Sequence, residues 1–311
     1  MGWTVADIPD LSGQVFVVTG ANSGVGYWTA RAIVDHGGHV VMACRDVRRS
    51  ADALANAQKS GPGTAELMQL DLADLVSVAQ FATDLVAKFS NVNGLVNNAG
   101  VMGGKRRSTA QGFELQMGTN HLGHFALTAQ LWPSLAVTAG ARVVSLSSLA
   151  ARGGFLNPEM DENLLIDPRP YSAFPVYSNT KQATLLFSQE LHRRTIDVGS
   201  NVTSLAAHPG ISSTNLFNRQ LREWKLNVLT PVATAAGRTA FHSPRAAAQP
   251  SLRALTDTAI PGGAFVGPGA LGQYRGAPTE VPVYSTATNP ATAERLWDLS
   301  EQITTVDFPV S

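Results

Sequence analysis

The chain has 311 residues, of which 44% are hydrophobic and 15% are charged. That much apolar sequence is enough for a full core and excludes a disordered chain. The 23 basic and 23 acidic residues give a net charge of zero, which argues against a nucleic-acid-binding protein because such proteins carry a basic excess. A single cysteine, Cys44, excludes an intramolecular disulfide framework and a metal site built from several cysteines.

The N-terminal residues lack the basic and apolar stretches of a secretory signal. No apolar run approaches the roughly 20 residues that a membrane helix needs. We therefore expect a cytoplasmic protein that has neither a membrane nor a nucleic acid as its partner. Homo-oligomerisation stays open from the sequence.

Short apolar segments alternate with longer helical patterns along the chain. Six near-continuous apolar runs predict buried strands, and the run GGAFVG predicts a weaker seventh. In chain order these strands cover residues 14–19, 39–43, 66–70, 94–97, 142–147, 201–206 and 262–267. The helical spacing of apolar residues predicts helices over 24–36, 74–89, 112–135 and 175–195. Ser243-Pro244 and Asn289-Pro290 each have the pattern of an N-cap followed by proline at the first helical position.

This alternation of strands and helices is typical of βαβ units. It predicts an α/β fold, with a single Rossmann-type, doubly wound parallel sheet of about seven strands and helices on both faces. No linker divides the chain, so we expect residues 1–311 to form one domain with a C-terminal extension from about residue 262. Two long loop-like segments, 153–174 and 211–234, follow predicted strands at the edge where such sheets bind ligands.

A glycine-rich turn, TGANSGVG at residues 19–26, lies between the first strand and the first helix. Its glycines allow a tight turn and a close approach to a pyrophosphate, which then meets free N–H groups at the helix N-terminus. The turn therefore predicts a dinucleotide site. Its cofactor-binding residues are Gly20, Asn22, Ser23, Gly24, Val25 and Gly26.

The end of the second strand predicts which dinucleotide is bound. Arg45 follows this strand directly, and an arginine here can hold the 2′-phosphate of NADP, whereas an acidic residue would accept the ribose hydroxyls of NAD. We expect NADP rather than NAD, although the adjacent Asp46 leaves some ambiguity. The alternative is that these charges form a solvated helix N-terminus.

Tyr177 and Lys181 are four residues apart in the predicted helix over 175–195. Residues at that spacing share one helix face, so a phenol and an ammonium group can point into one site. A fixed cation would lower the phenol pKa from its free value near 10 towards the range useful for acid–base catalysis. A tyrosine and a lysine four residues apart often occur by chance, so this spacing alone does not establish an active site.

Taken in order, the motifs resemble the short-chain dehydrogenase/reductase family over about residues 12–260. The resemblance lies in TGANSGVG, NNAG at 97–100, Asn120, Ser147-Ser148, the Tyr177 and Lys181 pair, and Pro209-Gly210. Four further stretches are similar to its retinol-dehydrogenase-like branch: ACRD at 43–46, TNHLGHF at 119–125, AHPGISSTNL at 207–216 and RLWDLSEQIT at 295–304.

The resemblance implies roles for individual residues. Tyr177 would be the general acid or base, and Lys181 would bind the nicotinamide ribose and lower the pKa of Tyr177. Ser148 would hold the substrate oxygen, and Asn120 would complete a proton relay through water and Lys181. Further cofactor contacts would come from Asp71, Leu72, Asn97, Ala99, Gly100, Pro209, Gly210, Ile211 and Thr214.

Several of these residues have structural alternatives. Asp71 could cap a helix, Asn97 could belong to a turn, and Pro209-Gly210 could be an ordinary turn. His121, His124 and His208 are expected to be structural, because no set of His, Asp and Glu residues has metal-ligand spacing.

The preferred function is an NADP-dependent oxidoreductase that interconverts a small alcohol, expected to be apolar, and a ketone or aldehyde. The alternative is a catalytically silent dinucleotide-binding sensor or scaffold. Residues 212–230 carry apolar positions at helical spacing, which favours an amphipathic helix acting as a lid; a static surface helix or a subunit contact is the alternative.

Overall fold

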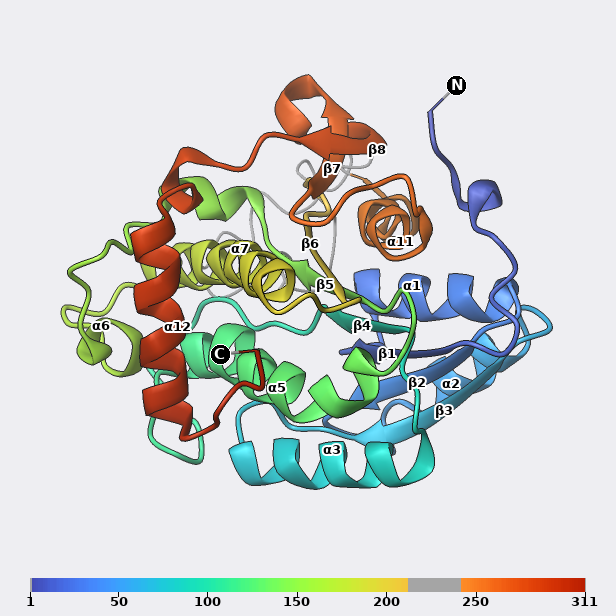
Figure 1. Cartoon of the computed structure of the whole chain (residues 1–311), viewed down its shortest axis with the longest axis horizontal. Coiled ribbons are helices and arrows are strands. Elements are labelled where there is room, and N and C mark those ends of the chain that lie inside the picture. Colours follow the sequence, from blue (N-terminus) through green and yellow to red (C-terminus); the bar gives the residue numbers. More distant parts are fainter. Residues whose placement is uncertain (1, 212–241, 311) are drawn as a thin grey trace, which may run out of the picture.

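A central sheet of eight strands dominates the computed structural model, which describes residues 2–211 and 242–310 (Figure 1). The strand order is β3-β2-β1-β4-β5-β6-β7-β8. Neighbouring strands are parallel except for β7 and β8, which pair antiparallel. The strands are β1 (Val15–Thr19), β2 (His39–Cys44), β3 (Thr64–Gln69), β4 (Gly94–Asn97), β5 (Arg142–Leu146), β6 (Thr203–Ala207), β7 (Phe265–Ala270) and β8 (Arg275–Val281).

The Rossmann-type doubly wound sheet predicted from the sequence is confirmed, and β8 is an addition to it. The β8 sequence contains Gly276 and Pro278, which weaken a strand signal. Proline is tolerated at the edge of a sheet, where its missing N–H need not pair, and β8 is the last strand in the order.

Helices cover both faces of the sheet (Figure 1). Side chains alternate along each strand, so that Phe16 and Val18 of β1 join the core on one face and Val17 joins the core on the other. The helices of the first face are α1 (Gly24–Asp35), α2 (Ala51–Gln58), α10 (Pro244–Ala247) and α11 (Gln249–Thr256). The second face carries α3 (Leu75–Lys88), α5 (Gly123–Ala136) and α7 (Ala173–Asp197), with α12 (Pro290–Thr304) packed on α7.

Helices α3, α10 and α12 each begin with a capping side chain, and the caps of α10 and α12 are the two predicted from the sequence. Asp74 accepts a hydrogen bond from the Val76 N–H at the start of α3, and Asn289 accepts one from Ala291 ahead of α12. Ser243 accepts one from Ala246, with proline at the first position of α10. Helix α2 has no counterpart among the predicted helices.

The helix predicted over 112–135 is interrupted. It consists of α4 (Leu115–Met117), a π-helical turn η2 (Gly118–Leu122) and α5. The remaining short elements are α6 (Glu162–Ile166) and the 3₁₀ turns η1 (Val5–Asp7), η3 (Leu149–Gly153), η5 (Leu271–Gln273) and η6 (Ser285–Ala287).

The strand order reverses between β1 and β4, which is the switch point where open α/β sheets bind ligands. The loops after β1, β4, β5 and β6 therefore meet at the carboxyl edge of the sheet. The predicted lid at 212–230, and Thr214 within it, lie outside the described residues.

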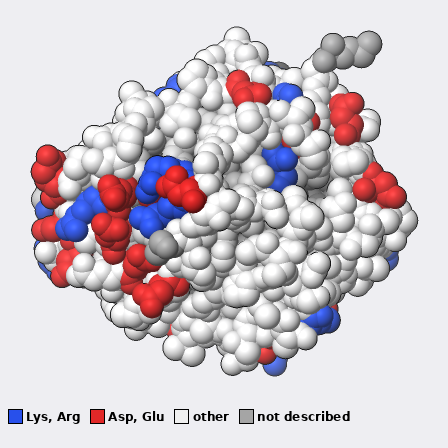
Figure 2. All heavy atoms as spheres, viewed as in Figure 1, with Lys and Arg blue, Asp and Glu red and all other residues white. Residues whose placement is uncertain are grey.

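The charged side chains on the face shown in Figure 2 are mixed in sign. Most of them gather in the region of α12, where Arg and Lys alternate with Asp and Glu, and much of the remaining visible surface is uncharged. This face carries no single-sign stripe.

Candidate active site

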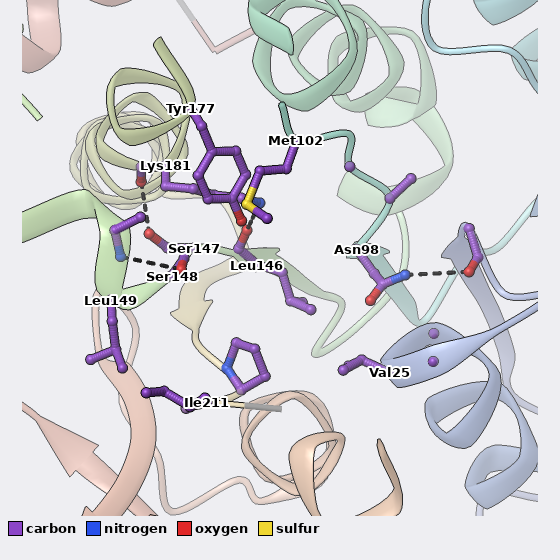
Figure 3. A pocket seen from close by; sticks show the side chains of 18 of the residues that line it. Val25, Asn98, Met102, Leu146, Ser147, Ser148, Leu149, Tyr177, Lys181 and Ile211 are labelled. Atoms are coloured by element: carbon purple, nitrogen blue, oxygen red, sulfur yellow. Dashed lines mark hydrogen bonds between the residues drawn. The ribbon is translucent and has the colours of Figure 1, made fainter. Parts of the chain in front are cut away.

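A pocket of about 610 Å³ opens at the switch point of the sheet (Figure 3). It brings together most of the residues that the sequence predicts for the site. These are Gly20, Asn22, Ser23, Gly24, Val25, Gly26, Ala99, Gly100, Ser148, Tyr177, Lys181, Pro209, Gly210 and Ile211.

The glycine-rich turn is shaped by backbone conformations and close approaches that favour glycine. Gly20 and Gly24 have φ angles of 65° and 58°, in the left-handed region. A side-chain carbon at Gly26 would lie 2.6 Å from the Gly20 carbonyl oxygen. The Asn98 amide Nδ2 donates to the carbonyl oxygen of Thr19 at 2.6 Å and joins the turn to the loop after β4.

The first turn of α1 opens onto the pocket. Its N-cap residue, Ser23, makes no side-chain capping hydrogen bond, and the three residues that follow it line the pocket. The N–H groups of this turn are therefore not satisfied by their own cap, and the helix dipole adds partial positive charge there.

Tyr177 and Lys181 lie one turn apart on α7, as their spacing predicts. Both side chains are buried, and the Lys181 Nζ lies 5.9 Å from the centroid of the Tyr177 ring. Lys181 Nζ also donates to the main-chain carbonyl oxygen of Leu146 at 2.8 Å, which holds it at the end of β5. The phenol and the ammonium group thus reach the same pocket from one helix face.

Burial changes the acidity of both groups. It raises the pKa of Tyr177 to about 12, although a hydrogen bond with the Ser148 side chain acts in the opposite direction. Burial lowers the pKa of Lys181 to about 8. The sequence predicts a lowered tyrosine pKa, but loss of solvent outweighs the hydrogen bond here. At neutral pH Tyr177 therefore carries a proton that it can donate, and Lys181 is mostly charged.

The two serines after β5 have different partners. Ser147 Oγ donates to the main-chain carbonyl oxygen of Lys181 at 2.7 Å and ties α7 to the sheet. Ser148 Oγ accepts from the Ala150 N–H at 3.2 Å and contacts Tyr177. Because only a hydrogen bond donated to the phenolate lowers the phenol pKa, the Ser148 hydroxyl proton is directed at the Tyr177 oxygen in this contact.

Asn120 lies in η2, behind the pocket wall. Its Oδ1 accepts from the Val101 N–H at 2.8 Å, and its Nδ2 donates to the Val101 carbonyl oxygen at 2.9 Å. Nδ2 also donates to Thr180 Oγ1 at 3.0 Å. The Asn120 side chain therefore holds the loop after β4 against the helix that carries Tyr177.

Comparison with known proteins agrees with this geometry. The model of a family described as short chain dehydrogenase matches residues 14–158. Human retinol dehydrogenase 12 is 36% identical over 294 residues, which cover 93% of this chain and 86% of that protein. Mouse retinol dehydrogenase 14 is 35% identical over 303 residues, with coverage of 94% and 86%.

The chain belongs to the short-chain dehydrogenase/reductase family. Within the family it falls in the retinol-dehydrogenase-like branch. It is therefore an oxidoreductase of a family that binds a nicotinamide dinucleotide.

A crystal structure of an uncharacterized protein from Mycobacterium Paratuberculosis shares 39% identity and a TM-score of 0.81, and covers 99% of this chain and 100% of that one. The L-sorbose reductase of Gluconobacter frateurii, complexed with NADPH and L-sorbose, has the same fold at 20% identity and a TM-score of 0.66, over 82% of this chain and 94% of that one.

The residues of this short-chain dehydrogenase/reductase fit the dinucleotide. A pyrophosphate needs room close to the backbone and free N–H groups at a helix N-terminus. Gly26 leaves that room, because a side chain there would fill it, and the N-terminus of α1 has no side-chain cap. Gly20–Gly26 would hold the pyrophosphate, and Lys181 and Pro209–Ile211 would lie at the nicotinamide end of the same pocket.

Of the predicted site residues within 2–211 and 242–310, five do not line the pocket. Arg45 is exposed just beyond β2. The Asp71 carboxylate accepts from the Ala73 N–H at 3.0 Å in the turn ahead of α3, whose N-cap is Asp74 instead, and Leu72 is buried in the core. Asn97 Nδ2 donates to Thr128 Oγ1 at 3.0 Å, inside the helical layer. The fifth is Asn120, which contacts the loop behind the wall.

The pocket also contains residues that the sequence reasoning missed. Asn98 lines it in place of its neighbour Asn97, because successive side chains at a strand end point to opposite faces. Phe174 comes from the end of the long segment 153–174, which the sequence did mark as a binding loop. No sequence signal indicates the others, which are Met102, Leu146, Leu149, Ala150 and Tyr274.

The histidines near the site have structural partners. His121 Nε2 and Ser300 Oγ are 2.8 Å apart, and His208 Nδ1 accepts from the Gly210 N–H at 3.2 Å. Within residues 2–211 and 242–310, no group of three or more His, Cys, Asp or Glu residues is arranged to hold a metal ion. No helix in that part of the chain is both long and apolar enough to cross a membrane.

Proposed function

We propose that this protein is an NADP(H)-dependent enzyme that interconverts an alcohol and a ketone or aldehyde. The observation that carries the proposal is one pocket lined by the glycine-rich turn, Ser148, Tyr177 and Lys181 together. A dinucleotide held by the turn and a substrate oxygen held at Ser148 would share that pocket.

The side chains of the pocket supply binding and proton transfer. The nicotinamide supplies or accepts the hydride when it is bound. Ser148 donates a hydrogen bond to the substrate oxygen and orients it towards Tyr177. In reduction Tyr177 gives its hydroxyl proton to the carbonyl oxygen, and in oxidation it takes the proton from the alcohol. The charge on Lys181 favours the phenolate that remains after proton donation.

The surroundings of β2 support NADP over NAD. The Asp46 carboxylate accepts from the Arg49 N–H at 3.0 Å and pairs with Arg49 Nε at 3.2 Å, so a ribose would have to compete for it. Arg45 is exposed beside it, and no acidic side chain in the described residues pairs with its guanidinium. This arrangement favours a bound 2′-phosphate, because arginine recognises phosphate through paired N–H groups.

The substrate half of the pocket supports an apolar substrate. The apolar side chains of Met102, Leu149, Phe174 and Ile211 line the pocket. Figure 3 shows Met102 beside Tyr177 and Leu149 towards Ile211. The relatives named retinol dehydrogenases support the same class of alcohol. A small polar substrate would leave this apolar surface without a partner.

The test is turnover by the purified full chain with NADPH or NADH, against aldehydes and ketones of increasing apolar size and the matching alcohols with NADP or NAD. We expect NADPH consumption with at least one apolar carbonyl compound. Tight NADPH binding without turnover of any compound would establish the silent alternative. Faster turnover with NADH would overturn the cofactor assignment.

A further inference from the structure

Two apolar walls of the pocket come from separate parts of the chain. Met102 belongs to the loop after β4, and Phe174 lies at the start of α7. Figure 3 shows Met102 beside Tyr177, on the side of the pocket away from Ile211. Both residues line the same pocket as Tyr177, so their positions limit the space that a substrate can occupy there.

The buried amide of Gln116 connects the residues next to both walls. Its Oε1 accepts from the Gly103 N–H at 2.9 Å, and its Nε2 donates to the Ala173 carbonyl oxygen at 3.0 Å. Nε2 also donates to Tyr171 Oη at 3.1 Å. Gly103 directly follows Met102, and Ala173 directly precedes Phe174. Both N–H donors and the oxygen of the amide are therefore engaged in holding the walls.

Gln116 is itself held in place. It lies in α4, whose N-cap residue Glu114 is fully buried and accepts from the Met117 N–H at 2.8 Å. Tyr171 Oη donates to Glu114 Oε1 at 3.3 Å, and the Glu114 N–H donates to the Ile166 carbonyl oxygen at 2.8 Å. The Gln116 amide thus has little freedom to follow one wall if the other moves.

An outer contact links the same two segments. Arg106 Nη2 and Asp167 Oδ1 form an ion pair at 2.5 Å, and the Leu115 N–H donates to the Arg107 carbonyl oxygen at 2.9 Å. None of these four residues is adjacent in sequence to Met102 or Phe174, whereas Gln116 bonds a direct neighbour of each. Asn120 also ties the loop after β4 to α7, through Val101 and Thr180, but of these links only Gln116 bonds the residue before Phe174.

We propose that Gln116 is a specificity-determining positioning residue: its amide fixes the separation of Met102 and Phe174 and thereby the width of the substrate end of the pocket. Gln116 does not line the pocket and acts only through its neighbours. If the walls separate, the part-buried Gly103 N–H and Ala173 carbonyl oxygen lose their Gln116 partner, which is energetically costly. The inference rests on the proposed function, since it takes Tyr177 as the reacting group.

The main test variant is Gln116→Glu. The substituted side chain has the same length and can still accept from the Gly103 N–H, but a carboxylate cannot donate to the Ala173 carbonyl oxygen. The substitution therefore removes the hydrogen bond next to Phe174 and retains the one next to Met102. The matched control is Gln111→Glu, five residues earlier, on an exposed side chain that contacts Asp74 and Leu75 instead.

The readout is the ratio of kcat/KM for a branched or cyclic aldehyde to kcat/KM for a short linear one. We expect Gln116→Glu to shift this ratio towards the bulky aldehyde by about tenfold, the smallest effect usual for a change of one methylene in a pocket. The Kd for NADPH should be unchanged, because the glycine-rich turn is not involved. Gln111→Glu should leave the ratio as in the wild type.

A second readout does not depend on turnover. In Gln116→Leu the Gly103 N–H loses its acceptor, so its hydrogen exchange should quicken by about tenfold or more relative to Gln111→Leu. An unchanged aldehyde ratio in folded Gln116→Glu, or unchanged exchange at Gly103 in folded Gln116→Leu, overturns the inference and leaves the proposed function intact. If the wild type turns over no carbonyl compound or alcohol, the proposed function fails, and the inference that rests on it falls too. If Gln116→Leu does not fold, Gln116→Glu decides alone.

Discussion

His124 Nδ1 donates a hydrogen bond to the main-chain carbonyl oxygen of Asn120, at a distance of 3.0 Å. A carbonyl oxygen only accepts, so this contact places the proton on Nδ1. Burial lowers the pKa of His124 to about 4, so the ring is neutral at pH 7 and its Nε2 is an acceptor. Thr19 Oγ1, 2.9 Å away, is then the donor to Nε2.

This imidazole completes a buried chain of hydrogen bonds across the site. Thr19 directly precedes the glycine-rich turn, and at the other end Asn120 Nδ2 donates to Thr180 Oγ1. Thr180 Oγ1 donates in turn to the carbonyl oxygen of Tyr177 at 2.8 Å. His124 therefore joins the turn proposed to hold the dinucleotide to the helix that carries the proposed general acid.

We expect His124→Phe to lower both the free energy of unfolding and kcat. The variant removes the His124 hydrogen bonds to the Thr19 hydroxyl and the Asn120 carbonyl oxygen, at a cost of about 1–3 kcal/mol. His124→Asn retains a donor near the Nδ1 position and should lose less of both. Urea unfolding and single-turnover kinetics measure the two effects.

The matched control for His124 is His121→Phe. His121 is also buried, but its ring contacts Ser300 rather than the chain that leads to Tyr177. The His121→Phe variant should have a lower free energy of unfolding than the wild type but the same kcat. Equal losses of kcat in the two phenylalanine variants would show a general packing effect instead of a connection through His124.

Replacing Tyr177 with Phe removes the transferable proton and very little volume. We expect kcat to fall by about 10²–10⁴-fold, the range for general acid–base catalysis, with the Kd for NADPH nearly unchanged. Steady-state kinetics and fluorescence titration measure the two quantities. Tyr27→Phe is the control, because Tyr27 does not line the pocket. Turnover at the wild-type rate in Tyr177→Phe would remove this residue from the mechanism.

Arg45→Ala should weaken binding of NADP(H) far more than binding of NAD(H). A charged hydrogen-bonded pair with the 2′-phosphate is worth about 1.5–3 kcal/mol, and NAD lacks that phosphate. Calorimetric titration with both cofactors measures the difference. Lys59→Ala removes an exposed positive charge just after α2 and controls for net charge. The same loss for both cofactors in Arg45→Ala would contradict the NADP assignment.

The buried histidines predict that the protein loses stability in mild acid. Burial lowers the pKa values of His121, His124 and His208 from 6.5 to about 3, 4 and 3. Between pH 6.5 and 4 the unfolded chain therefore binds more protons than the folded one, so stability falls as the pH decreases through this window. At pH 5 each histidine should cost about 2 kcal/mol relative to pH 7.

Urea unfolding at pH 7 and pH 5 tests this expectation. Burial raises the pKa values of Glu114 and Asp298, which acts in the opposite direction, but these are two carboxyl groups against three imidazoles. His121→Gln should reduce the difference between the two pH values. A free energy of unfolding that is the same at pH 5 and pH 7 would show that these rings are not held neutral by the fold.

Local patterns in the sequence were sufficient for much of this protein. The apolar strand runs predict a parallel doubly wound sheet, because strands buried on both faces need apolar residues at every position. The turn before α1 and the pairing of Tyr177 with Lys181 follow from short spacings within one element. Such features depend only on residues close together in the chain, so the sequence is enough to predict them.

Other features depend on contacts between distant segments, and the tertiary structure alone decided them. The Tyr177 pKa is raised rather than lowered because burial, which no spacing reveals, removes water from the phenol. Asn98 rather than Asn97 reaches the pocket because of the direction in which β4 ends. The residue after Met102 and the residue before Phe174 are joined only once the fold places the buried Gln116 amide between them.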